Sequence, residues 1–311
     1  MRNQSKIIPI AFAFNDAYAE TAAASLASLL RTKKEETFYD IFILHNDTLS
    51  DKTREQFECF FTEQYKKFQF HWTYVNAERL ERFPLCKMSV ETYFRLLIPE
   101  LLPQYNQVIW ADCDFIFLKD ISEYYNLDLA DNEVAMPRDI VNEEEYCIAH
   151  AFHPEIKRAY IYTTCFMVIN AKLWREQHLT DRFIHTATEY YDRIKLCDLD
   201  ILNLTCRNII ELPFRSAVLV GYLNGENSSR TSDCPYSAKE VEAGIKDPSI
   251  IHYAGLENPK PWKDKNPFQP KYKPWIQNIR RSPFGKRYSF WRELACKRKA
   301  LSKAIKARLR G

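Results

Sequence analysis

The chain has 311 residues, of which 46% are hydrophobic and 27% are charged, and its formal net charge is +3 at pH 7. This composition is typical of a globular protein, and the length allows one large domain or a domain with a small appendage. No stretch approaches the roughly 20 apolar residues that a membrane span needs, and the amino terminus lacks the form of a signal peptide. Nine cysteines without a CxxC pair favour reduced thiols, so we expect a cytoplasmic protein.

The first part of the chain alternates apolar runs with helical segments. The pattern predicts strands at residues 6–14, 39–44 and 68–75, with helices at 18–30 and 50–67 between them. Alternation of this kind predicts an open α/β sheet with mostly parallel strands.

The next part adds a helix at 89–102, ended by Pro103, and a short apolar strand at 107–110 that leads directly into Asp112 and Asp114. Further strands are predicted at 165–170 and 250–253, and a helix at 172–191. Because ligands bind beyond the carboxyl ends of the strands in such sheets, the acidic pair lies where a binding site is expected.

Asp112 and Asp114 are two residues apart, so an extended backbone would project both carboxylates to the same side. Carboxylate oxygens suit Mg²⁺ or Mn²⁺, which can clamp a diphosphate and neutralise the charge that grows on it as it leaves. An Asp-x-Asp pair alone is a weak signal, and an ordinary acidic loop is the alternative. Its position directly after an apolar strand strengthens the metal interpretation.

Five ordered motifs resemble glycosyltransferase family 8, the retaining galactosyl- and glucosyltransferases. They are residues 89–96 (SVETYFRL), 108–114 (VIWADCD), 167–175 (MVINAKLWR), 198–203 (DLDILN) and 251–262 (IHYAG leading to KPW). The resemblance extends over roughly residues 6–263. It implies an α/β fold of the GT-A type, with a single Rossmann-like domain at 1–263, a mixed, mostly parallel sheet, and a small helical C-terminal appendage at 264–311.

The resemblance also implies the metal ligands and the diphosphate contacts. Asp112, Asp114 and His252 would hold Mn²⁺ or Mg²⁺, a combination of carboxylates and neutral imidazole that suits this ion. Gly255 would let the backbone approach the diphosphate, and Lys260 would pair with it as a point charge. A solvated proline-rich loop is the alternative for this last segment.

Further residues would contact the donor sugar or its nucleotide. Arg95 would contact the diphosphate or the sugar, and its alternative is a salt bridge with Glu91 on the same helical face. Asp198 would bind sugar hydroxyls while Asp200 supports the loop. The remaining contacts implied are Lys87, Asp139, which could equally be an ordinary loop acid, and the nucleotide contacts Ala13, Asn15, Tyr18 and Cys113.

Three departures from the family pattern affect the expected chemistry. Asn15 replaces the more usual aspartate beside the uracil, and Thr163, Thr164 and Cys165 stand where relatives often have Asn-Ala-Gly or Asn-Ser-Gly. Leu199 stands where some relatives carry a glutamine discussed as a nucleophile, and leucine cannot act as one. For a retaining enzyme, departure and attack on the same face of the sugar would then be expected.

The last fifteen residues carry seven basic side chains and no acid, and removing these seven from the formal +3 leaves the rest of the chain at −4. Leu301, Ile305 and Leu309 recur at four-residue spacing among them, which predicts an interfacial helix attracted to anionic lipid. A solvated helix or a disordered end is the alternative. Nucleic-acid binding is not expected, because the basic stretch lacks interleaved aromatics and the body is acidic.

Together these features predict a metal-dependent retaining glycosyltransferase that moves glucose or galactose from a UDP-sugar to a saccharide or glycolipid acceptor. We expect it to serve lipopolysaccharide or other surface-glycan synthesis, peripherally bound at the inner face of the cytoplasmic membrane. The alternative is a catalytically degenerate, membrane-associated protein that binds nucleotide sugars.

Overall fold

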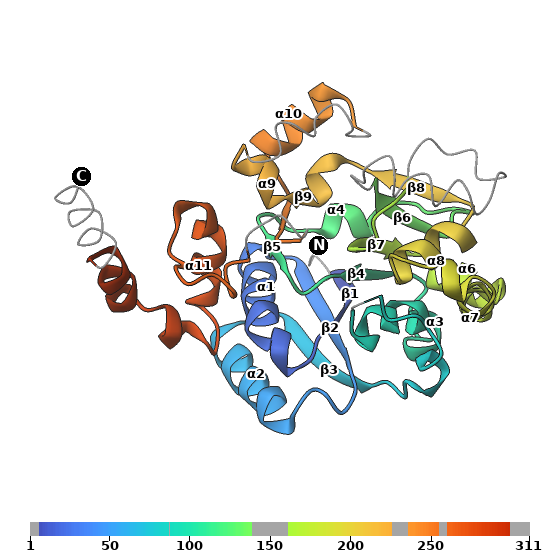
Figure 1. The fold of residues 1–311 in the computed structure, drawn as a ribbon, viewed down its shortest axis with the longest axis horizontal. Helices are drawn as coiled ribbons and strands as arrows, with labels where there is room; N and C mark the ends of the chain where they lie inside the picture. The colour runs from blue at the N-terminus through green and yellow to red at the C-terminus, as the bar shows by residue number, and fades with distance from the viewer. Residues whose placement is uncertain (1–5, 87, 139–160, 226–235, 255–259, 299–311) are drawn as a thin grey trace, which may run out of the picture.

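The computed structural model describes residues 6–86, 88–138, 161–225, 236–254 and 260–298. Its centre is a seven-stranded sheet in the order β3-β2-β1-β4-β7-β6-β8 (Figure 1). The strands are β1 (Lys6–Ala13), β2 (Thr37–His45), β3 (Phe68–Tyr74), β4 (Val108–Ala111), β6 (Val134–Pro137), β7 (Phe166–Ile169) and β8 (Ile209–Leu212). Only β7 runs antiparallel to its neighbours in this sheet, which confirms the mixed, mostly parallel α/β fold.

Helices cover both faces of the sheet (Figure 1). One face carries α1 (Ala19–Thr32), α2 (Asp51–Gln64) and α11 (Lys273–Ile279), and the other carries η3 (Val90–Leu97), α3 (Ile98–Leu101), α6 (Ala171–Glu176), α7 (Leu179–Glu189) and α8 (Asp198–Thr205). Strand β2 shows why both faces are filled: Tyr39 and Ile41 join one buried cluster, whereas Phe42 joins the other. Successive side chains of a strand point to opposite faces, so an unbroken apolar run supplies two cores.

Two predicted helices differ from expectation. Residues 89–102 form the 3₁₀ helix η3 followed by the short α3, whose first turn contains Pro99. The predicted helix at 172–191 is divided into α6 and α7, because His178 adopts a left-handed conformation with φ 52°. Such a residue cannot continue a right-handed helix, and residue types alone do not reveal it.

A second, three-stranded sheet has the order β5-β10-β9 and was not predicted. It comprises β5 (Phe115–Phe117), β9 (Val218–Leu219) and β10 (Ile250–His252), with β10 antiparallel to β5 and parallel to β9. The register places His252 opposite Phe115. This pairing carries the histidine next to the acidic segment that precedes β5.

Besides a helical segment at 290–298, short elements complete the described chain. They are η1 (Asp16–Tyr18), η2 (Glu78–Leu80), α4 (Ser122–Tyr125), η4 (Tyr191–Arg193), η5 (Phe214–Ser216), α9 (Val220–Leu223), α10 (Ala238–Lys246), η7 (Pro270–Tyr272) and η8 (Gly285–Tyr288). Within the described ranges, no helix is long and apolar enough to cross a membrane.

The segment that follows the predicted boundary at 263/264 packs against α1 of the main domain. Trp275 and Ile279 of α11 are buried in the same cluster as Leu26 of α1, and Arg31 Nε donates to Asn278 Oδ1 at 3.0 Å. The division into 1–263 and 264–311 stays a prediction.

Candidate active site

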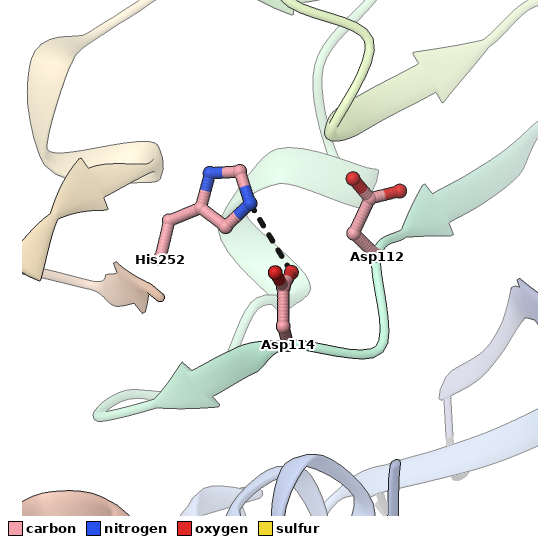
Figure 2. A group of neighbouring side chains, drawn as sticks. All are labelled: Asp112, Asp114 and His252. Carbon is pink, nitrogen blue, oxygen red and sulfur yellow. Dashed lines mark ion pairs between the residues drawn. The ribbon is translucent and has the colours of Figure 1, made fainter. Parts of the chain in front are cut away.

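The acidic pair lies in a turn between β4 and β5. Strand β4 ends at Ala111 and β5 begins at Phe115, so the expectation of an extended Asp112–Asp114 segment was wrong. The turn nevertheless brings both carboxylates toward His252, which approaches from β10 (Figure 2). One ligand atom from each of the three residues lies within 4.8 Å of the others. We call Asp112, Asp114 and His252 the metal-ligand cluster.

Charge pairing orders this cluster. His252 Nε2 lies 3.1 Å from Asp114 Oδ1, and the edge of the imidazole meets the Phe115 ring at a centroid distance of 4.7 Å. Burial disfavours the charged imidazole, but the neighbouring Asp114 carboxylate outweighs it and raises the pKa of His252 to about 10. Burial raises the pKa of the Asp114 carboxyl, whereas the positive charges of His252 and Lys260 lower it. The two cations outweigh burial, so this pKa lies below its usual range.

The cluster fits a hard divalent cation. Asp114 Oδ1 is buried and has no hydrogen-bond partner apart from its ion-pair contact with His252. A buried acceptor without a donor is costly, and a cation would satisfy it. Two carboxylates and one imidazole form a donor set that Mn²⁺ or Mg²⁺ accepts.

Lys260 borders the metal-ligand cluster. Its Nζ lies 3.9 Å from Asp114 Oδ2, donates to the carbonyl of Tyr253, and lies 5.7 Å from the centroid of the Trp262 ring. Burial of the ammonium lowers the pKa of Lys260, although the nearby carboxylates oppose this. A second positive charge therefore lies beside the place expected for the diphosphate.

Arg95 is buried, with only 5% of its surface exposed. Its Nη2 donates to Asp112 Oδ1 at 2.9 Å, and its Nη1 lies 3.2 Å from Asp198 Oδ2. The guanidinium also donates to the carbonyl of Thr164 and lies 4.5 Å from the centroid of the Trp110 ring. The alternative ion pair with Glu91 was wrong, and Arg95 instead joins two acidic segments.

Asp198 is the other end of this network and is also buried. Its Oδ1 accepts from Thr92 Oγ1 and its Oδ2 from Thr164 Oγ1, each at 2.6 Å. We call Arg95, Asp198, Thr92 and Thr164 the arginine cluster. Asp200 accepts from the backbone N–H groups of residues 195 and 196, which is the loop-supporting role predicted for it.

Sequence reasoning missed three residues here. Thr92 and Thr164 hold Asp198, and Trp110 Nε1 donates to Asp112 Oδ1 at 3.0 Å. The departure from the family pattern at residues 163–165 was a signal for Thr164, although a contact with Asp198 was not predicted from it. Trp110 gave no signal beyond its place in an apolar strand.

The predicted nucleoside contacts lie at the end of β1, next to β4. Asn15 caps η1, and its Oδ1 accepts from the backbone N–H of Ala17 at 3.1 Å. Tyr18 is 39% exposed, and burial of its hydroxyl together with the nearby Cys113 and Asp114 raises the pKa of its phenol. Ala13 is the last residue of β1. The structure thus brings these residues to the side of the metal-ligand cluster.

Other predicted features lie outside the described residues. They are Lys87, Asp139, Gly255 and the basic tail from residue 299 onward.

The family model for Glycosyl transferase family 8 matches residues 9–266, and the chain belongs to this family. The fold is similar to a solved structure of the galactosyltransferase LgtC in complex with donor and acceptor sugar analogs, with a TM-score of 0.71. The two share 20% identity, and the match covers 88% of this chain and 95% of that chain. This likeness confirms the GT-A-type fold.

Curated relatives include enzymes of different lengths. The chain is 25% identical over 191 residues to the probable glycosyl transferase Gly of Streptococcus gordonii, covering 61% of this chain and 24% of that protein. It is 21% identical over 288 residues to the lipopolysaccharide 1,2-glucosyltransferase of Escherichia coli (strain K12), covering 85% and 82%. The chain spans about a quarter to a third of the two streptococcal glycosyltransferases that it matches.

Proposed function

We propose that this protein is a metal-dependent retaining hexosyltransferase that takes glucose or galactose from a UDP-sugar. The observation that carries the proposal is the metal-ligand cluster at the carboxyl end of β4, with an orphaned buried oxygen on Asp114 and the Lys260 ammonium beside it. The connection from β1 leads to β2 on one side, whereas β4 lies on the other side of β1. In open α/β sheets a ligand binds in the crevice at such a reversal.

Each residue has a role that follows from its position. A Mn²⁺ or Mg²⁺ ion held by Asp112, Asp114 and His252 would neutralise charge on the departing diphosphate. Lys260 adds a second positive charge on the same side. Asn15 and Tyr18, at the end of the neighbouring strand, are placed for the nucleoside.

Leu199 cannot act as an enzyme nucleophile that attacks the donor sugar, because its half-buried side chain is apolar. Asp198 is held by Thr92, Thr164 and Arg95, so reaching a sugar hydroxyl would require it to share or exchange one of these contacts. We therefore favour a route in which the leaving group departs and the acceptor hydroxyl attacks on the same face of the sugar. This route retains the anomeric configuration that the family resemblance implies.

The proposed acceptor is a saccharide or glycolipid of lipopolysaccharide or another surface glycan, a class supported by the name of the E. coli relative. We propose a position at the membrane surface, which the helical segment at 290–298 supports. Phe290 and Trp291 in it are 63% and 76% exposed, and Lys297 and Arg298 follow in the same segment. Exposed aromatics beside basic residues are typical of interfacial helices.

The test is UDP release from a panel of UDP-hexoses with Mn²⁺ and candidate saccharide acceptors. We expect release from one donor, lost with EDTA and in Asp114→Asn, and kept in the control Asp181→Asn, which removes an exposed carboxylate of α7 that pairs with Arg79. Turnover that survives loss of the metal ligands would refute the mechanism.

A second candidate function is nucleotide-sugar binding without turnover, which Asn15 and Leu199 favour. Calorimetric binding of UDP without consumption of any donor, across the acceptor panel, would support this candidate over the transferase.

A further inference from the structure

The loops after β1 and β2 meet at one buried side chain. Asn15 follows β1 and Thr48 follows β2, and both contact Glu91, which lies in the first turn of η3. Glu91 Oε1 lies 2.5 Å from Thr48 Oγ1 and 3.4 Å from Asn15 Nδ2. The carboxylate thus lies at the carboxyl edge of the parallel strands, on the side of the crevice away from β4.

The carboxylate of Glu91 is incompletely satisfied. Only 5% of the residue is exposed, and its Oε2 is buried without a hydrogen-bond partner. Among the described residues, no Lys, Arg or His lies within ion-pair distance of it. A buried carboxylate oxygen without a donor is destabilising, so its presence calls for a donor that the chain itself does not supply.

Holding the loop after β2 does not account for this arrangement. Asn46 already holds that loop, because its Oδ1 accepts from the backbone N–H and the hydroxyl of Thr48 at 3.1 and 2.6 Å. The single hydroxyl hydrogen of Thr48 can serve Asn46 or Glu91 but not both at once. When Thr48 serves Asn46, Glu91 Oε1 keeps only the longer contact with Asn15 Nδ2, and Oε2 has no donor in either case.

We propose that Glu91 determines nucleobase specificity by accepting the N3–H of uracil on Oε2, while Asn15 Nδ2 donates its second hydrogen to an adjacent uracil carbonyl. The inference rests on the proposed function, because it takes the ligand to be a uridine diphosphate sugar. Cytosine presents a bare ring nitrogen where uracil presents N3–H, so it would place one acceptor against another. Sites built to bond a donor strongly reject analogues that lack it.

The test compares UDP and CDP affinities by calorimetry in Mn²⁺ for wild type, Glu91→Gln and Glu91→Thr. We expect wild type to prefer UDP by about 100-fold or more, and both variants to narrow that preference by at least about tenfold. Glutamine is nearly isosteric and can turn its amide N–H toward the bare nitrogen of cytosine. The control is Glu58→Gln, which removes an exposed carboxylate that accepts from Trp72, and it should keep the wild-type ratio.

Thermal melting of each variant checks that the fold is kept. An unchanged UDP-to-CDP ratio in both Glu91 variants, or an equal loss of affinity for both nucleotides, would overturn the role of Glu91 and leave the proposed function intact. If wild type binds neither nucleotide, the proposed function fails and the inference fails with it.

Discussion

Asp112 of the metal-ligand cluster is bound by Arg95 of the arginine cluster, but the two clusters differ in how their carboxylates are satisfied. Asp198 in the arginine cluster has a donor on each oxygen and a guanidinium beside it. Asp114 in the metal-ligand cluster keeps one buried oxygen without a donor. A carboxylate whose donors come from the fold holds its neighbours in place, whereas one that lacks a donor is left to bind a ligand. The first cluster should therefore govern stability, and the second should govern catalysis.

The largest expected effect comes from Arg95→Met. It leaves the buried Asp198 and the adjoining Asp112 without their cation, and removing one partner of a buried ion pair costs about 3–5 kcal/mol. The free energy of unfolding, measured by urea titration, should fall by that amount. Arg79→Met is the control, because it removes exposed ion pairs with Glu100 and Asp181 worth about 0–1 kcal/mol. Equal losses in both variants would contradict the comparison.

Asp114→Asn should affect catalysis more than stability, in contrast to Arg95→Met. Loss of a metal ligand should lower kcat at least about 100-fold, or about 2.7 kcal/mol of transition-state stabilisation. The free energy of unfolding without metal should fall by clearly less than in Arg95→Met, since His252 can become neutral once its partner is gone. Steady-state kinetics and urea titration measure the two quantities. A stability loss as large as that of Arg95→Met would erase the distinction between the clusters.

The sequence predicts the layered fold because its strands are local features. Residues 37–45 form an apolar run whose side chains fill both faces of the sheet, and Ser50 caps α2 by accepting from the backbone N–H of Thr53. The second sheet was not predictable in this way. Its pairing of β10 with β5 joins segments more than 130 residues apart in the chain, and the sequence of neither strand indicates which strand it pairs with.

The candidate site shows the same division. Resemblance to the family supplied Asp112, Asp114, His252 and Lys260, which the structure brings together. The residues that position these site side chains could not be predicted from the local sequence pattern. Arg95 lies four residues after Glu91 on one element, yet it bonds to Asp112 and Asp198, because the packing of η3 against other elements decides its partners.

Thr164→Val sharpens the comparison inside the arginine cluster. The variant keeps the side-chain shape and removes the hydroxyl that donates to Asp198 Oδ2, while Arg95 still binds that oxygen. We expect a loss of about 1–2 kcal/mol in the free energy of unfolding. Thr164→Ser keeps the donor and should lose clearly less. If the two variants lose the same amount, the hydroxyl does not hold Asp198.

The smallest expected effect lies at Asp112, the residue that joins the clusters. Trp110 Nε1 and Arg95 Nη2 both donate to Asp112 Oδ1, so the other oxygen is the one we expect to face a cation. Trp110→Phe removes one of the two donors. Partners that orient a metal ligand are commonly worth 10- to 100-fold in metal affinity, and because Arg95 remains, we expect a loss in Mn²⁺ affinity of no more than about tenfold.

Trp174→Phe is the matched control for this last change. Trp174 is equally buried, and its Nε1 donates to the carbonyl of Glu133, away from the metal-ligand cluster. Both variants leave a comparable cavity and should lose similar stability, so only a difference in Mn²⁺ affinity, measured by calorimetry, reports on Asp112. Equal Mn²⁺ affinity in the two variants would mean that Arg95 alone orients this carboxylate, and that the metal-ligand cluster depends on the arginine cluster through a single contact.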